Sequence, residues 1–226
     1  MSTQPIKSVI FDMDGTIIDT ELISKAGWGH ALKQHGFTLT DDIYDKMIGR
    51  NLATARELLT TQYAGSDFDA ILKIRSFHME EHIAKHGLEM KKGLIFILDE
   101  LDRLGIKKCI ATSTEWASME KKLNSLNLMG RFDGFVAGDQ VQIGKPHPEI
   151  FLKAANIVET HPRNCMAIED SPAGIASAHA AGIRVIMVPD IIAPTEETKS
   201  RTYATCNDLI EVAKLIEDLV LEYPPA

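Results

Sequence analysis

Cysteine and aromatic residues are scarce in this 226-residue sequence, which has three cysteines and 6% aromatic residues. The sequence also lacks a long apolar run. No stretch reaches the ~20 apolar residues of a membrane-spanning helix, so we expect no membrane association. The cysteines, Cys109, Cys165 and Cys206, are far apart and match no metal-binding spacing. Because Cys109 and Cys165 fall within apolar runs, the sequence predicts buried thiols in a reducing cytoplasm.

Basic residues are fewer than acidic residues. Lysine and arginine total 24 against 32 acidic residues, which gives a formal net charge of −8. A nucleic-acid-binding protein usually carries a basic patch, so we expect no nucleic-acid partner. The N-terminus has no apolar signal-peptide core before the first apolar run, which favours the cytoplasm. For the oligomeric state, our default expectation is a monomer.

Short apolar runs that are typical of β-strands recur along the chain and alternate with helical patterns. The leucine and isoleucine spacing from Leu94 to Leu104 indicates one helix, with Gly105 as its C-terminal cap. Ser171 and Pro172 indicate the start of another. This alternation predicts an α/β fold with a Rossmann-like, doubly wound parallel sheet. The strand-like runs are 8–11, 108–112, 134–138, 165–169 and 184–188.

The segment 20–90 interrupts this alternation, since it contains helical patterns and no convincing strand. Some 70 residues are too many for a connection between adjacent strands of a sheet. We therefore expect a helical subdomain at 20–90, inserted after the first strand. The catalytic core would then consist of 1–19 and 91–226.

Polar residues follow several of the predicted strands. Asp12 and Asp14 follow the first, and because they are two residues apart in an extended chain they share one side. In an open α/β sheet, ligands bind beyond the carboxyl ends of the strands. These side chains are therefore expected to converge on one crevice. The other members of the set are Thr112, Ser113, Thr114, Lys145, Glu169 and Asp170.

Four carboxylates in one crevice would not all stay ionised without positive charge among them. Oxygen ligands favour a hard cation, and Mg²⁺ is the expected cofactor. A cation, a lysine and hydroxyl donors around a reactive carboxylate suit phosphoryl transfer. One carboxylate can act as the nucleophile, and a second can protonate the leaving oxygen and then deprotonate a water.

The stretches "FDMDGT", "ATS", "GKPHPEIF" and "EDSPAG" resemble, in this order, the four motifs of the haloacid dehalogenase superfamily. The resemblance is to its branch of small phosphatases and β-phosphoglucomutase-like proteins, and it extends from Ile6 to about Val188. It implies a Rossmann-like core with an α-helical cap inserted after the first strand, as the pattern of the segment 20–90 also indicates.

The resemblance also implies a role for each motif residue. Asp12 would be the nucleophile and a Mg²⁺ ligand, and Asp14 the general acid/base, with its backbone carbonyl on the metal. Thr112 would bind the transferring phosphoryl group, and Lys145 would neutralise it. The further assignments are Asp170 as a metal ligand, Glu169 as a ligand or as the orienter of a metal-bound water, and Thr16, Arg50, Ser113 and Thr114 as substrate-binding residues.

Three functions remain to be weighed at this point. A receiver-type signalling domain does not fit the chain length or the order of the acidic residues. Mutases of this branch commonly have valine where Thr16 stands and histidine where Ser24 stands, which favours water as the phosphoryl acceptor. We therefore predict a Mg²⁺-dependent phosphatase that hydrolyses a small sugar or polyol phosphate through an aspartyl phosphate. The alternative is a β-phosphoglucomutase-type sugar-phosphate mutase.

Overall fold

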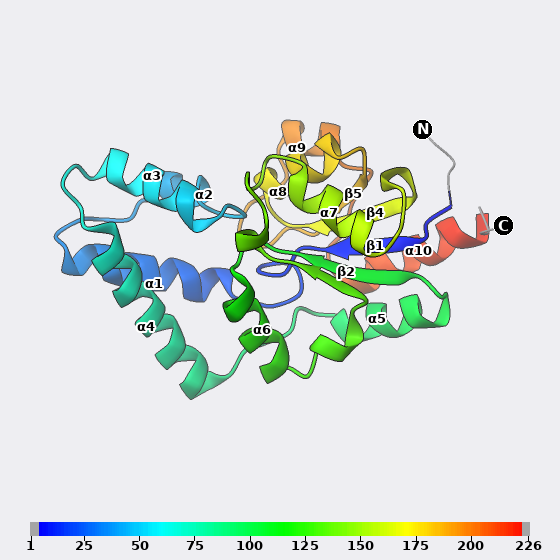
Figure 1. The fold of residues 1–226 in the computed structure, drawn as a ribbon, viewed down its shortest axis with the longest axis horizontal. Helices are drawn as coiled ribbons and strands as arrows, with labels where there is room; N and C mark the ends of the chain where they lie inside the picture. The colour runs from blue at the N-terminus through cyan, green and yellow to red at the C-terminus, as the bar shows by residue number, and fades with distance from the viewer. Residues whose placement is uncertain (1–4, 223–226) are drawn as a thin grey trace.

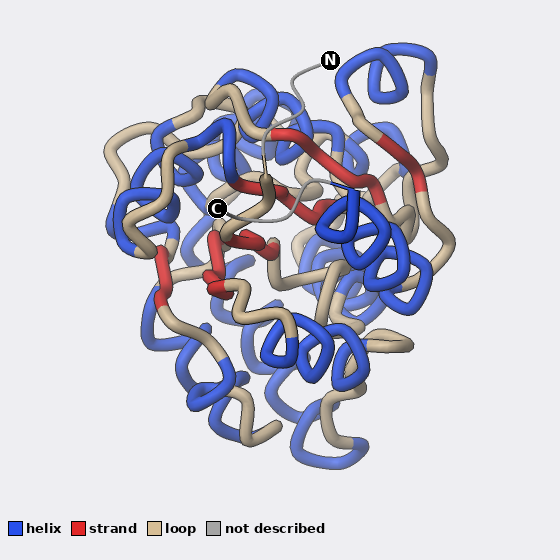
Figure 2. The backbone as a smooth tube through the Cα atoms, turned by 90° about the vertical axis from the view of Figure 1, so that its right-hand side faces the viewer, coloured by secondary structure: helices blue, strands red, loops and turns tan. Residues whose placement is uncertain are grey.

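The computed structural model describes residues 5–222, and a six-stranded, wholly parallel sheet forms its centre. The strand order is β3-β2-β1-β4-β5-β6, so the first strand lies in the middle. Figure 2 shows the strands surrounded by helices. The strands are β1 Ser8–Phe11, β2 Lys107–Ala111, β3 Gly134–Val136, β4 Cys165–Glu169, β5 Arg184–Met187 and β6 Ala204–Thr205.

The sheet is buried on both faces, which explains why its strands are continuous apolar runs rather than alternating ones. Successive side chains of a strand point to opposite faces. Val9 and Phe11 accordingly belong to one apolar cluster, whereas Ile10 belongs to a second on the other face. The first cluster includes side chains of α5 (Leu94–Arg103), α6 (Trp116–Ser125) and α10 (Leu209–Glu222). The second includes those of α7 (Glu149–Ile157) and α8 (Pro172–Ala180).

The sequence predictions for the core agree with this structure. All five predicted strands are present, and β6 is a short sixth strand at the edge of the sheet. Helix α5 ends at Arg103, and Gly105 follows with φ +66°. Ser171 caps α8 through its side chain, which accepts a hydrogen bond from Gly174 N. The helices of the core are α5 Leu94–Arg103, α6 Trp116–Ser125, α7 Glu149–Ile157, α8 Pro172–Ala180, α9 Glu196–Arg201 and α10 Leu209–Glu222, with short 3₁₀ turns at Met129–Arg131, Gly138–Gln140 and Pro162–Asn164.

Between β1 and α5 the chain forms four helices, which lie to one side of the sheet in Figure 1. They bury their own apolar cluster, which includes Trp28, Leu32 and Leu59. Helices α1 (Glu21–Gln34) and α4 (Phe68–His86) approach closely at Gly27, where a Cβ would lie 3.3 Å from Arg75 Cγ. We call residues 20–90 the helical insert. Its helices are α1 Glu21–Gln34, α2 Asp41–Asp45, α3 Leu52–Gln62 and α4 Phe68–His86.

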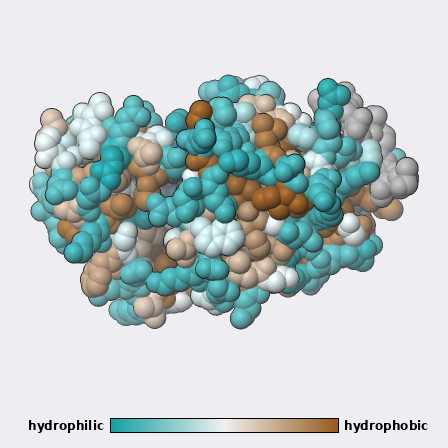
Figure 3. Space-filling view, in the orientation of Figure 1, coloured by the Kyte–Doolittle hydropathy of each residue, from teal (hydrophilic) through white to brown (hydrophobic). Residues whose placement is uncertain are grey.

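Two further expectations concern burial. Cys109, Cys165 and Cys206 are buried and unpaired, as predicted for the first two. Within residues 5–222, the helices are all too short or too polar to cross a bilayer. The face shown in Figure 3 is mainly hydrophilic, with apolar side chains gathered over α7, where Leu152 and Ile157 are exposed.

Candidate active site

The motif residues meet at the carboxyl ends of the central strands. Strand β1 pairs with β2 on one side and with β4 on the other, so the direction of the connections reverses here. Such a reversal point is where open α/β sheets bind their ligands. Asp12 directly follows β1, and its backbone N–H donates to the carbonyl of Ile168 in β4. Thr112 follows β2 in the same way and donates to Val136 of β3.

Lys145 is a fully buried cation at the centre of the cluster. Its Nζ lies 2.5 Å from Asp12 Oδ1 and 2.6 Å from Glu169 Oε1. Burial by itself would lower the pKa of Lys145, but the two carboxylates outweigh it and raise that pKa above its ordinary value. Lys145 is therefore charged and ties the end of β1 to the end of β4.

Asp12, Glu169 and Asp170 form a buried group in which one oxygen of each lies within 4.8 Å of the others. Burial raises the pKa values of Asp12 and Asp170 above the ordinary range, and the neighbouring carboxylates add to the effect. One lysine does not neutralise three carboxylates, so the site fits a further cation. An all-oxygen donor set of this kind suits Mg²⁺.

The second contacts of these carboxylates distinguish their roles. Asp170 Oδ1 accepts a hydrogen bond from the hydroxyl of Thr16 at 3.1 Å. Glu169 uses both oxygens within the protein, because Oε1 contacts Lys145 and Oε2 accepts from the backbone and hydroxyl of Ser171. Both oxygens of Glu169 therefore have partners within the protein, and the residue also belongs to the buried group that could hold a cation. Thr16, for which substrate binding stays a prediction, is buried against Asp170 and is not among the residues that line the cavity.

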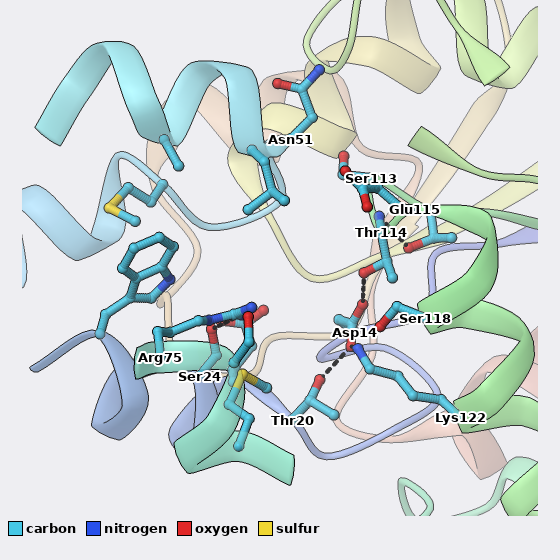
Figure 4. A pocket seen from close by; sticks show the side chains of 18 of the residues that line it. Asp14, Thr20, Ser24, Asn51, Arg75, Ser113, Thr114, Glu115, Ser118 and Lys122 are labelled. Atoms are coloured by element: carbon cyan, nitrogen blue, oxygen red, sulfur yellow. Dashed lines mark hydrogen bonds and ion pairs between the residues drawn. The ribbon is translucent and has the colours of Figure 1, made fainter. Parts of the chain in front are cut away.

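Asp14 lies beside this group and has its own set of partners (Figure 4). Its carboxylate accepts from Lys122 Nζ at 2.5 Å, from Thr114 at 2.6 Å and from Thr20 at 2.7 Å. Burial alone would raise the pKa of Asp14, but Lys122 and the hydroxyls together lower it below its ordinary value. Asp14 is therefore an ionised carboxylate with a defined orientation.

A cavity of about 690 Å³ opens between the core and the helical insert. Asp12, Asp14 and Thr112 line its core side, and Thr112 Oγ1 accepts from Thr114 N at 3.1 Å. The predicted substrate-binding residues that line it are Arg50, Ser113 and Thr114. Figure 4 shows Asp14 and Thr114 on the core wall opposite the side chains of the insert.

The insert contacts the core at the rim of this cavity. Ser113 Oγ donates to the carbonyl of Gly49 at 2.8 Å, and Lys121 of α6 pairs with Glu80 of α4 at 2.9 Å. Gly49 has φ +74°, and a Cβ there would lie within 2.6 Å of Ser171 Cβ. The absence of a side chain at Gly49 therefore allows the insert to approach the loop that follows β4.

Sequence reasoning missed several residues of this cavity, of which Lys122 is the clearest. A signal for it was present: Ser118, Lys122 and Ser125 recur at helical spacing and line the cavity together with Lys121. The opposite face of α6 carries the buried Met119 and Leu123. The sequence alone does not show that this polar face adjoins Asp14. Thr20, Glu21, Ser24 and Arg75 were also missed as cavity residues.

Comparison with known proteins places this geometry in a family. The model of the haloacid dehalogenase-like hydrolases matches residues 9–188. A phosphorylated carbohydrates phosphatase of Thermotoga maritima is 30% identical, over 80% of this chain and 84% of the relative. Hexitol phosphatase A of Escherichia coli is 28% identical, over 80% and 82%.

A solved structure supports the fold independently of sequence. The β-phosphoglucomutase of Clostridium difficile superposes with a TM-score of 0.80 at 22% identity, covering 96% of this chain and 98% of that one. The likeness at this identity concerns the fold, whereas the family model covers all four motifs and the insert. This chain belongs to the haloacid dehalogenase-like hydrolase family.

Proposed function

We propose that this hydrolase is a Mg²⁺-dependent phosphatase that cleaves a small sugar or polyol phosphate through a phosphorylated Asp12. The observation that carries the proposal is Asp12 itself, which is held by the buried Lys145 at the cavity wall, next to the separately oriented Asp14. The relatives named above act, by their names, on phosphorylated carbohydrates and hexitol phosphates. These names support the substrate class.

The first half of the reaction transfers the phosphoryl group to the protein. A carboxylate oxygen of Asp12 attacks phosphorus, and the bond from phosphorus to the substrate oxygen breaks. Asp14, which is ionised in the free protein, would take up a proton from solvent when the anionic substrate binds, and it gives this proton to the departing alkoxide. The ammonium of Lys145 and the hydroxyl of Thr112 bind the phosphoryl oxygens and offset their negative charge.

The second half returns the protein to its starting state. Asp14, now a carboxylate, takes a proton from a water molecule, and the water oxygen attacks phosphorus. The bond between phosphorus and the Asp12 oxygen breaks, which releases inorganic phosphate. The ionised Asp14 described above, held by Lys122, Thr20 and Thr114, is in the form that this step requires.

Asp12, Asp170 and the backbone carbonyl of Asp14 would hold Mg²⁺. Glu169 would orient Asp170 and Lys145 through the contacts that both of its oxygens already make. When bound, the cation supplies charge neutralisation at the phosphoryl group and at Asp12. Lys145 and Thr112 would then complete the ring of positive charge and hydroxyl donors.

The helical insert would act as a cap, with its boundaries at 20–90 and the core at 1–19 and 91–226. Its contacts with the core at Gly49 and Glu80 support this role, because they cover the cavity from the side that faces Asp14. A closed cap excludes bulk water during the first step and opens for product release. Arg50, Ser113 and Thr114 would contact the substrate within the closed cavity.

The mutase alternative differs only in the acceptor of the phosphoryl group. Ser24, at the position where mutases of this branch commonly have histidine, accepts a hydrogen bond from Arg75 at 2.9 Å. Ser24 therefore has a partner within the cap, and its hydroxyl does not serve as a proton-transfer group in the way that a histidine does. It favours water as the acceptor.

The test is a phosphate-release assay over a panel of sugar and polyol phosphates, with and without Mg²⁺. We expect release from several of them in the presence of Mg²⁺ and loss of release after chelation. A parallel assay follows conversion of β-glucose 1-phosphate to glucose 6-phosphate. Conversion faster than phosphate release would favour the mutase, and inactivity in both assays would overturn the proposal. We also propose that the protein is a monomer, which gel filtration tests, and that it acts in the cytoplasm.

A further inference from the structure

Arg75, on α4, is a cation of the helical insert with unsatisfied hydrogen-bonding capacity. Its Nε is buried and has no hydrogen-bond partner. One Nη donates to Ser24, and the guanidinium lies over the ring of Trp28, with 5.2 Å from Cζ to the ring centroid. Among residues 5–222, no acidic side chain forms an ion pair with Arg75. The residue is half-buried, and its Nε, which is shielded from water without a hydrogen bond, carries a desolvation penalty that a nearby anion would offset.

Local packing fixes this guanidinium in place. The aliphatic stem of Arg75 lies against Gly27, where α1 and α4 approach so closely that a side chain on α1 would displace it. Arg75 and Ser24 both line the cavity. In Figure 4, Arg75 extends from α4 towards the open space that separates it from Asp14 and Lys122. The side chain thus points into the cavity.

Asp14 and Glu21 both act on Arg75 through their charge, but among residues 5–222 neither forms an ion pair with it. The carboxylate of Asp14 already accepts from Lys122, Thr114 and Thr20. Glu21 accepts a hydrogen bond from the hydroxyl of Tyr44 at 2.7 Å and is buried. Burial raises the pKa of Glu21 to about 7, so its negative charge is weakened. The positive charge of Arg75 is therefore available to the cavity. Arg50, the cap arginine predicted from the sequence, is exposed and also lines the cavity.

From these contacts we infer that Arg75, with Ser24, forms a cap-side subsite for a second anionic group of the substrate, distant from the phosphoryl group that Asp12 takes. The substrate would be a phosphorylated sugar acid or a sugar bisphosphate rather than a neutral sugar monophosphate. A planar guanidinium binds either carboxylate or phosphate with two hydrogen bonds, and both groups are candidates. The inference rests on the proposed phosphatase function and narrows its substrate class.

The test uses pairs of esters that differ only in the second group. Glycerol 3-phosphate and 3-phosphoglycerate differ by a terminal carbinol or carboxylate, and fructose 6-phosphate and fructose 1,6-bisphosphate differ by a second phosphate. We expect wild-type kcat/KM to be higher for the anionic member of at least one pair, and the pair that shows this identifies carboxylate or phosphate. Phospho-acids of two, three and four carbons then measure the distance from Asp12 to the subsite.

Arg75→Met is expected to lower kcat/KM for the preferred anionic ester about 10- to 100-fold more than for its neutral partner, mainly through KM, because a charged hydrogen-bonded contact is lost. Ser24→Ala should give a smaller change of the same kind, and Arg75→Lys an intermediate one. The control is Arg56→Met, since Arg56 is an exposed arginine of α3 that pairs with Asp69 outside the cavity. A thermal midpoint for each variant confirms that it is folded.

Two results would overturn the inference while leaving the phosphatase intact. One is hydrolysis of neutral esters with no preference for an anionic partner in either pair. The other is an equal loss on both members of a pair in folded Arg75→Met. If the wild-type protein releases phosphate from no ester in the panel, the proposed function itself fails, and the inference fails with it.

Discussion

The core and the helical insert place their functional side chains in different ways. In the core, Asp12, Lys145 and Glu169 are buried and joined by short ion pairs at the carboxyl end of a sheet that is covered on both faces. In the insert, a single apolar cluster supports Arg75, whose Nε has no partner in the protein. The contrast is that the charged groups of the core are paired with one another within the protein, whereas Arg75 of the insert keeps a hydrogen-bond donor that we propose a substrate would use.

Asp12→Asn should have the largest effect, because it removes the nucleophile from the core. We expect kcat to fall at least ~1,000-fold for every substrate, with no change in the ranking of substrates. The fold should persist, since asparagine has the same shape and one fewer buried charge. Phosphate release and the thermal midpoint measure the two properties. A variant that retains wild-type turnover would show that the reacting carboxylate lies elsewhere.

Two adjacent lysines of α6 separate core chemistry from cap contact. Lys122→Met removes the cation that orients Asp14, and we expect kcat to fall about 10- to 100-fold, as for partners that orient a reacting group. The matched control, Lys121→Met, removes the exposed pair with Glu80 and should change kcat less than threefold, since exposed ion pairs contribute little. Equal effects of the two substitutions on kcat would argue against an orienting role for Lys122.

Gly49→Ala tests the approach of the insert to the core. The added Cβ meets Ser171, and φ +74° is strained for alanine, so the closed arrangement should be disfavoured. We expect a loss of about tenfold in kcat/KM, with a KM increase for all substrates. Gly36→Ala is the control, because Gly36 also has a positive φ (+80°) but its added Cβ meets no atom within 4 Å. If both variants lose activity equally, backbone strain rather than closure explains the effect.

Glu149 gives the smallest and most local prediction. Its carboxylate accepts from the backbone of Gln142 and Ile143, next to Lys145, and pairs with Lys153. The hydrogen bond from Lys153 and those from the backbone lower its pKa to about 2. Because the folded state binds this proton less tightly than the unfolded state does, the stabilisation is present above pH 4.5 and is lost towards pH 2.

Urea unfolding of wild type and Glu149→Gln at several pH values measures this contribution. We expect the wild type to have the higher midpoint at pH 7 and the difference to shrink as the pH falls below 4.5. A difference that does not change with pH would mean that the charge of Glu149 is not involved. Turnover should change only a few-fold, because Lys145 is held by Asp12 and Glu169 as well.

The contrast between the two regions also explains what the sequence predicted. Lys145 and Asp170 were found because each follows a recognisable motif at the end of a buried strand, where a parallel sheet brings distant segments together. Strand β6 was missed since its two residues carry too little pattern to identify. The contact of Thr16 with Asp170 was missed for another reason: the motif gives the position of Thr16, but only the fold shows that its hydroxyl faces Asp170.

Arg75 shows more clearly what could not be predicted from the sequence. An arginine within a polar helix is indistinguishable in sequence from a surface residue, and most arginines are exposed. Its orientation depends on the crossing of α1 and α4 at Gly27, which is a tertiary contact between residues far apart in the chain. Arg50 was predicted from residue type alone. It lines the cavity as expected, while the arginine with a buried nitrogen that lacks a hydrogen-bond partner is Arg75.

The central claim is that Asp12 becomes phosphorylated, and beryllium fluoride, which mimics an acyl phosphate on a carboxylate, tests it most directly. With Mg²⁺ present, we expect ¹⁹F resonances of a bound trifluoroberyllate in the wild-type protein and a crystal structure with beryllium bonded to Asp12 Oδ. Asp12→Asn should show neither. The same bound resonances in Asp12→Asn, or beryllium on another side chain, would contradict the account.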